Sequence, residues 1–189
     1  MPLPPADVAR EPLHTRSIRV NSFARQDGLW DIEAELIDLK AYDFPKKSGA
    51  LHQAGDPIHH IHLRVTIDDQ FTITAAVADY DAAPYGMHCT RIAPDYQGLV
   101  GMNLLRNFRQ TVKDRYGRSA GCTHLTELSY VLPTVAVQTM ANKRRREQQS
   151  GVQARRPFQL DGCHALKLDG PVVQEFYPRW YAAAKAETQ

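Results

Sequence analysis

Residues 60–67 read HIHLRVTI, a strict alternation of polar and apolar side chains, and this stretch decides the fold class. Alternation with a period of two places the isoleucine, leucine and valine side chains on one face of a β-strand and the polar side chains on the other. A short polar turn at 68–70 leads into a second β-rich run at 71–77, FTITAAV. The two runs together predict a β-hairpin.

Two more strands are expected upstream of this hairpin. Residues 17–23 alternate apolar and polar side chains, and Asp27-Gly28 marks a turn after them. Residues 29–36 place Trp30, Ile32, Ala34 and Leu36 on one face and acidic side chains on the other. This run is also compatible with a helix, but its period of two favours a strand that pairs with 17–23.

Helices are expected in the second half of the chain. One is predicted over about 98–116, with Gly117 as its stop, and another from about 121, where Pro133 should kink or break it. A third, amphipathic helix is predicted at the C-terminus, around Val172, Val173, Phe176, Tyr177 and Trp180. We therefore expect an α+β fold in which a small antiparallel sheet is packed by helices.

The chain divides into four predicted segments. Residues 1–14 are expected to form a flexible, proline-rich arm, and 15–142 the main α+β domain. A basic, exposed linker follows at 143–158, and 159–189 are expected to dock as a C-terminal helical segment. The basic run at 143–146 lacks interleaved aromatic residues, so a solvated helix end is favoured over a nucleic-acid site.

Composition excludes several classes of protein. The 189 residues are 43% hydrophobic and 23% charged, with a net charge of +2, so the chain can bury a core and is not a general nucleic-acid binder. No apolar run is long enough to cross a membrane and no signal-like start is present, so a cytoplasmic protein is expected. Nucleotide-binding and common hydrolase motifs are absent. The partner stays open, with a small molecule or another protein as the candidates and no membrane.

Cysteines are the first candidates for chemistry. Three cysteines without an export signal argue against a disulfide framework. Cys122 stands where a helix is expected to begin, and a helix N-terminus favours thiolate over thiol; His124, two residues on, can share a metal or move a proton. The alternative is a small buried residue. Cys89, beside His88 in an expected loop, and Cys163-His164 are further candidates, although Cys163 is better explained as a core residue.

Histidines are the second candidates. Four of the eight histidines, His52, His59, His60 and His62, fall within eleven residues. His60 and His62 are two residues apart on the predicted strand, so they share a face and can reach one metal such as zinc, iron or copper, while His59 points to the opposite face. The alternative is a solvated polar face without a ligand.

Several stretches of the chain resemble a bacterial family known only as a domain of unknown function, DUF2889. The stretches are 27–33 (DGLWDIE), 57–59 (PIH), 84–85 (PY) with Cys89, 99–101 (LVG) and 121–128 (GCTHLTEL). The resemblance runs from about Arg16 to Tyr181 and implies no activity.

The order of elements also resembles the IscU/NifU iron–sulfur scaffold family. Cys89 matches the cysteine that follows the hairpin in that family, and Cys122 the one that opens a late helix. The family's first cysteine is missing, and His59 or His60 stands near its place. The resemblance implies a mixed cysteine and histidine site that can hold zinc or an iron–sulfur cluster.

Three functions remain open from the sequence. The first is a metal- or iron–sulfur-binding accessory protein with Cys89 and Cys122 as thiolate ligands, His59 or His60 completing the site, and His124 as a ligand or its support. The second is a small enzyme in which Cys122 is the nucleophile or His124 the general base, acting on an acyl or aromatic substrate. The third is a ligand- or protein-binding module whose cysteines only pack.

Overall fold

The computed structural model describes residues 3–46, 48–141, 143, 156–157 and 159–182. The chain forms two compact units, Met1–Ala141 and Asn142–Gln189. Residues 3–13 contain no helix or strand, and the first strand begins at His14. Most of the predicted linker at 143–158 lies outside the described residues.

A four-stranded antiparallel sheet forms the centre of the first unit. Its strands are β1 (His14–Ala24), β2 (Trp30–Lys40), β5 (Pro57–Ile67) and β6 (Ile73–Ala82), in the order β1-β2-β5-β6. Every neighbouring pair runs antiparallel, as expected for strands joined by short connections. The four strands predicted from alternation are all present, and each extends beyond its predicted bounds at one or both ends.

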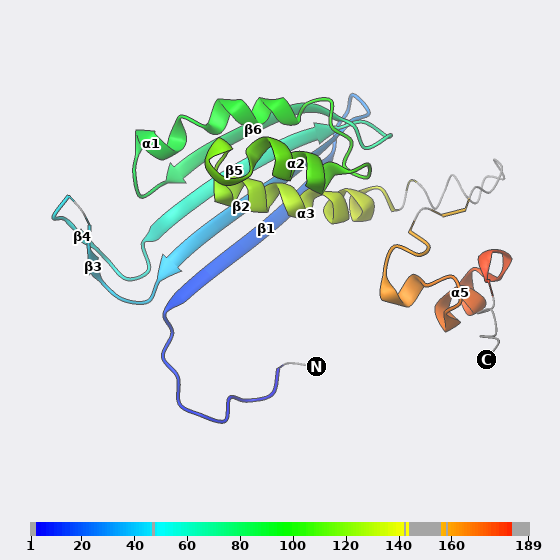
Figure 1. The fold of residues 1–189 in the computed structure, drawn as a ribbon, viewed down its shortest axis with the longest axis horizontal. Coiled ribbons are helices and arrows are strands. Elements are labelled where there is room, and N and C mark those ends of the chain that lie inside the picture. Colours follow the sequence, from blue (N-terminus) through cyan, green and yellow to red (C-terminus); the bar gives the residue numbers. More distant parts are fainter. Residues whose placement is uncertain (1–2, 47, 142, 144–155, 158, 183–189) are drawn as a thin grey trace. The chain divides into compact units, whose positions relative to one another are not determined.

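Helices cover one face of this sheet (Figure 1). The longest, α3 (Thr123–Thr139), contacts β1, β2 and β5, and α2 (Phe108–Tyr116) packs against α3. The alternating apolar side chains of the strands point toward these helices and form the core. Core residues on the strands include Ile32, Ala34, Leu36, Ile61, Leu63, Val65 and Ile67, and those on the helices include Phe108, Val112, Leu125, Leu128, Leu132 and Ala136. The α+β prediction of a small antiparallel sheet packed by helices is confirmed.

The helix predicted over 98–116 is wrong in its first half. Residues Ala93–Leu99 form a 3-10 helix, and α2 begins only at Phe108. Gly101 has a φ of 87° and Asn107 a φ of 53°, and a right-handed helix cannot pass through left-handed residues. Phe108 and Val112 are buried on one face of α2, as predicted. The turns at Gly101 and Asn107 restrict the helix to the second half of the predicted range.

Two predicted loops contain regular structure. Residues 43–57 include a two-stranded hairpin of β3 (Phe44–Pro45) and β4 (Leu51–His52). Residues 81–94 include the short helix α1 (Met87–Thr90), so Cys89 lies in a helical turn rather than in a loop. In α3, the helix continues through Pro133 instead of breaking there.

The second unit contains short helices in its described part. These are the 3-10 helices His164–Leu166 and Pro178–Trp180 and the α-helix α5 (Pro171–Phe176). The C-terminal helix predicted around Val172 to Trp180 is therefore two short pieces, separated at Tyr177. Among the described residues, no helix has both the length and the apolar character that a membrane span requires.

Candidate functional site

Asp38, near the end of β2, is a carboxylate on the helix-covered face of the sheet and is only 2% exposed. The register of β1 and β2 places Arg16 directly opposite it. The Arg16 guanidinium binds both carboxylate oxygens, with Nε donating to Oδ1 at 2.7 Å and Nη2 donating to Oδ2 at 2.8 Å. Arg16 also pairs with Glu127 of α3. This two-pronged contact fixes the plane of the Asp38 carboxylate.

Two imidazoles converge on Oδ2 of the same carboxylate, and a third, that of His14 on β1, places Nε2 3.3 Å from Oδ1. His59 on β5 is the cross-strand partner of Asp38, and its Nδ1 lies 3.0 Å from Oδ2. His124, in the first turn of α3, places Nε2 3.5 Å from the same oxygen. The two rings lie 3.8 Å apart between centroids. His59 from the neighbouring strand and His124, which follows Asp38 by 86 positions in the sequence, therefore meet at the buried Asp38 carboxylate.

The surroundings set the charges in this cluster. Burial raises the pKa of Asp38, but the Arg16 guanidinium and His59 outweigh it and hold that pKa below its ordinary value. Burial lowers the pKa of His59, and the neighbouring His124 lowers it further, against the opposing effect of Asp38. At neutral pH, Asp38 is therefore an anion and His59 a neutral imidazole.

Cys122 directly precedes α3, and its backbone is held by a buried tyrosine. The Tyr96 hydroxyl accepts a hydrogen bond from the Cys122 amide at 3.1 Å and donates one to the Cys122 carbonyl at 2.9 Å. Tyr96 itself is fully buried and also contacts the Thr126 hydroxyl at 3.1 Å. The position of Cys122 is thus fixed by the core rather than by a mobile loop.

The Cys122 thiol has an unusually low pKa. Burial alone would raise it, but hydrogen bonding by His124 and Tyr80 and by the amides of Leu125 and His124 lowers it from 9.0 to about 7. The sulfur lies 3.9 Å from His124 Nδ1. At pH 7 about half of such a thiol is thiolate, against about one part in a hundred for an ordinary cysteine.

Tyr80 on β6 lies near Cys122 and also lines a pocket, whose wall does not include Cys122 or His124. Its hydroxyl is buried and makes no hydrogen bond of standard geometry within the described structure. Tyr80 nevertheless lowers the pKa of the Cys122 thiol, and Cys122 raises the pKa of Tyr80. We therefore take the hydroxyl and the sulfur to lie close together without good hydrogen-bond alignment. Tyr80 also lines a pocket of about 650 Å³ between the β3–β4 hairpin and the β6–α1 connection. Other lining residues are Phe44, His52, Pro57, Ile58, Pro84, Tyr85 and Thr90.

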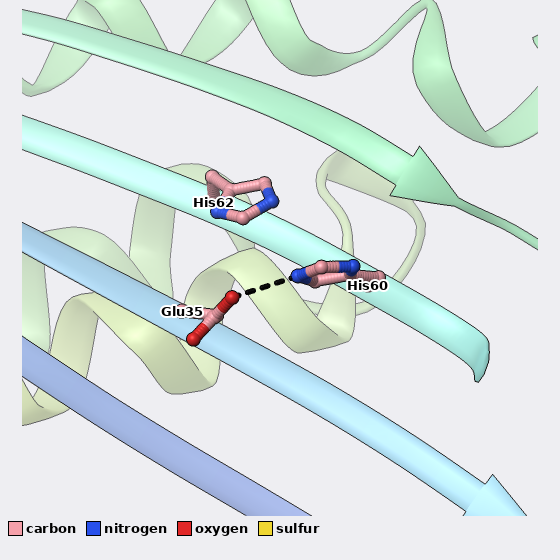
Figure 2. A group of neighbouring side chains, drawn as sticks. All are labelled: Glu35, His60 and His62. Atoms are coloured by element: carbon pink, nitrogen blue, oxygen red, sulfur yellow. Dashed lines mark hydrogen bonds and ion pairs between the residues drawn. The ribbon is translucent and has the colours of Figure 1, made fainter. Parts of the chain in front are cut away.

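A second cluster lies on the opposite face of the sheet, where Glu35, His60 and His62 meet (Figure 2). His60 Nε2 lies 2.8 Å from Glu35 Oε1. The predicted division of the histidines between two faces is confirmed, because His59 faces Asp38 while His60 and His62 face Glu35. In each cluster, three donor atoms lie within 4.8 Å of one another.

The remaining predicted residues are placed as follows. Cys122 adjoins the Asp38 cluster through His124, whereas neither three-donor group that the described residues form includes a cysteine. Cys89 is partly buried in α1, and its charge acts on the pKa of Tyr80. Cys163 is exposed, so its interpretation as a core residue is wrong. A metal site that uses Cys89 and Cys122 together stays a prediction.

Sequence reasoning missed the carboxylates. Asp38 was detectable, because the inward-facing positions of β2 run Ile32, Ala34, Leu36 and then Asp38, and an acid at an inward position needs a partner. Arg16 was not detectable in the same way, because its role depends on the register between two strands.

The fold and the site together define an α+β protein with a thiol–imidazole–carboxylate cluster at one end of a four-stranded sheet. The model of a family described as "Protein of unknown function (DUF2889)" matches residues 14–138, and the chain belongs to this family. Comparison with curated proteins and with solved structures gave no match. The likeness to the IscU/NifU scaffold fold stays a prediction.

Proposed function

We propose that this protein is a thiol-dependent enzyme in which Cys122 is the nucleophile, His124 the proton carrier and Asp38 the group that orients the imidazole. One observation carries the proposal: His124 lies between the Cys122 sulfur, 3.9 Å from Nδ1, and the Asp38 carboxylate, 3.5 Å from Nε2. A nucleophile, a base and a group that orients the base are the three parts of an activated thiol site.

The charges support a thiolate–imidazolium pair. Each nitrogen of His124 faces a group that is anionic when the thiol is deprotonated, so the doubly protonated ring satisfies both contacts. Arg16 keeps Asp38 ionised and prevents its carboxylate from turning. Both His124 distances are longer than strong hydrogen bonds, as is common in catalytic sites before a substrate binds.

The pocket beside Tyr80 supports an acyl substrate with an apolar or aromatic group. Its volume of about 650 Å³ suits a small molecule, and Phe44, Ile58, Tyr80 and Tyr85 give it apolar walls. In the proposed reaction, the Cys122 thiolate adds to the carbonyl carbon of an ester or thioester. The leaving alkoxide or thiolate departs with a proton from His124, and a thioester forms on Cys122. Water, deprotonated by His124, then hydrolyses this thioester and releases the carboxylic acid and the thiol.

The metal-binding role, which is the first of the three functions considered from the sequence, is the second candidate here. It is favoured by the donor atoms of Asp38, His59 and His124, which lie within 4.8 Å of one another. Such a set of nitrogen and oxygen donors suits zinc or ferrous iron. An iron–sulfur cluster is less well supported, because it is held mainly by thiolates and only Cys122 adjoins this group. The guanidinium of Arg16, already on both Asp38 oxygens, would repel an incoming cation.

Alkylation of the three cysteines as a function of pH tests the proposal. The rate of iodoacetamide labelling at Cys122, followed peptide by peptide by mass spectrometry, should rise with a midpoint at about pH 7. Replacing His124 with glutamine should raise that midpoint and slow labelling at pH 7 about tenfold. Cys163→Ser, a change at an exposed thiol in the other unit, is the matched control and should leave the Cys122 profile unchanged.

The outcome separates the two candidates. An acyl adduct on Cys122 after incubation with an aromatic thioester, lost in Cys122→Ser, supports the enzyme. A Cys122 midpoint near pH 9 in metal-free protein, or no acyl adduct on Cys122, contradicts it. One equivalent of metal in untagged protein, lost in His59→Ala, would favour the metal-binding role instead.

A further inference from the structure

We propose that the sheet face opposite α3 carries a separate binding site for a first-row divalent metal ion, formed by Glu35, His60 and His62, with Asp81 supporting the two imidazoles from outside the ligand set. This site lies on the other side of the sheet from Cys122 and does not depend on the thiol chemistry proposed above.

The β-sheet itself brings these donors together. His60 and His62 are two residues apart on β5 and therefore project from the same face, and His62 is the cross-strand partner of Glu35 on β2. Their side chains meet on this face (Figure 2). The backbones of these residues are held by the hydrogen bonds between strands. Ligands on strands keep their geometry more precisely than ligands on loops.

A β-bulge brings a supporting carboxylate to the imidazoles. The β5–β6 register pairs His60 with Ala82 but Ile61 with Tyr80, so Asp81 is an extra residue on β6 without a cross-strand partner. A bulge redirects the side chain of its extra residue. Here Asp81 Oδ2 lies 2.9 Å from His62 Nε2 and 3.4 Å from His60 Nδ1. His60 faces Glu35 with its other nitrogen, Nε2, so Asp81 orients the ring of a ligand instead of binding the same ion.

The donor geometry is close to that of a coordinated ion. One ligand atom each from Glu35, His60 and His62 lies within 4.8 Å of the other two. Donors on one ion, with bonds of about 2.0–2.2 Å, lie roughly 3–3.5 Å apart, so rotamer adjustments of about an ångström close the site. Side-chain exposures of 21% for His60, 38% for His62 and 31% for Glu35 leave room for this movement and for water on the ion.

The charge and type of the donors select the kind of ion. One ligand carboxylate and two neutral imidazoles carry a charge of −1, and the adjacent Asp81 carboxylate brings the local charge to −2, which one divalent cation balances. The mixture of nitrogen and oxygen donors suits Zn²⁺, Fe²⁺ or Co²⁺ and not Ca²⁺ or Mg²⁺, which prefer oxygen alone. Glu35 and His62 also border a hollow of about 520 Å³ with Arg19 and Arg64 in its wall. A site open to this hollow keeps coordination positions free for water or a small anion.

Titration of untagged, metal-free protein with Co²⁺ tests the inference, because the visible absorption of Co²⁺ reports its coordination. We expect one equivalent to bind with absorption typical of four- or five-coordinate nitrogen and oxygen ligation, and Zn²⁺ to displace it. His60→Ala and His62→Ala should each weaken binding at least about tenfold, and Asp81→Asn less. His88→Ala, at an exposed histidine outside the cluster, is the matched control and should bind like the wild type.

His59→Ala separates this site from the Asp38 cluster. It should leave Co²⁺ binding unchanged, and His62→Ala should leave the pH profile of Cys122 alkylation unchanged. Glu35→Gln keeps the shape of the side chain and guards against loss of the fold, which circular dichroism checks in each variant. The inference is overturned if no Co²⁺ binds at about 100 μM ion, because a weaker dissociation constant would not mark a specific site. It is also overturned if binding survives in both His60→Ala and His62→Ala.

Discussion

Asp38 shows how much a single residue depends on its neighbours. It continues the inward-facing row of β2, where apolar residues precede it, and an unpaired carboxylate there would cost several kcal/mol. The cost is offset because the neighbouring strand presents Arg16 at the same level, with both carboxylate oxygens bound. The ionised carboxylate that results is the feature around which His59 and His124 gather.

Arg16→Met should lower the free energy of unfolding by about 2 kcal/mol at pH 7, because it leaves the Asp38 charge buried without its main partner. Urea unfolding measures the loss. Arg25→Met is the matched control: Arg25 pairs with Asp27 and Asp31 at the surface, and water screens such pairs so that they contribute little to stability. Equal losses in the two variants would contradict the special role of Arg16.

The same pair predicts a pH dependence. The pKa of Asp38 is lowered in the folded state, so its ionised form stabilises the fold above the ordinary value of 3.8, and this contribution disappears as the pH falls through the lowered folded-state value. In Arg16→Met, burial without the guanidinium raises the folded-state pKa of Asp38 above that of the wild type. The stability difference should therefore be largest at pH 7 and shrink as the falling pH protonates Asp38 in the variant. A difference that stays constant from about pH 7 to about pH 3 would contradict this account.

At the scale of elements, α3 carries His124 of the proposed active site in its first turn and a proline, Pro133, in its interior. Its N-terminus holds His124 beside Cys122, and its apolar face packs on three strands. Pro133 lies inside the helix and has no N–H to donate to the carbonyl of Ser129, four residues before it. The packing of α3 on the sheet therefore stabilises a helix that its sequence alone would interrupt.

Pro133→Ala should raise the free energy of unfolding by about 1 kcal/mol, because it restores a backbone hydrogen bond and removes the clash of the ring with the preceding turn. Thermal and urea unfolding measure the change. Thr134→Ala, at the adjacent exposed position, should shift stability by less than about 0.5 kcal/mol. A less stable Pro133→Ala variant would show that the ring makes packing contacts that outweigh its backbone cost.

At the scale of the whole molecule, the groups that define the Cys122 site belong to one unit. The four-stranded sheet, the hydrophobic cluster and the residues that set the pKa of Cys122 all lie within Met1–Ala141. Of the described residues in the second unit, the buried ones are Pro157, Leu160 and Val173. The first unit therefore has the core of an independent domain.

A fragment of residues 1–141 should unfold in one cooperative transition and keep the Cys122 alkylation midpoint at about pH 7. Circular dichroism in urea and peptide-resolved labelling make the two measurements, with the full chain as the reference. A fragment without a cooperative transition would show that the first unit needs residues beyond 141.

The sequence by itself determined the strands, the α+β class and the two faces on which the histidines lie, because alternation is a local pattern that sterics enforce residue by residue. It did not determine where α2 begins, because the left-handed turns at Gly101 and Asn107 leave no mark in the spacing of apolar residues. It also did not determine the clusters. Asp38, His59 and His124 meet through strand register and the docking of α3, and Asp81 reaches His60 and His62 through a bulge. Contacts between distant residues depend on how whole elements pack, and only the tertiary structure decided that.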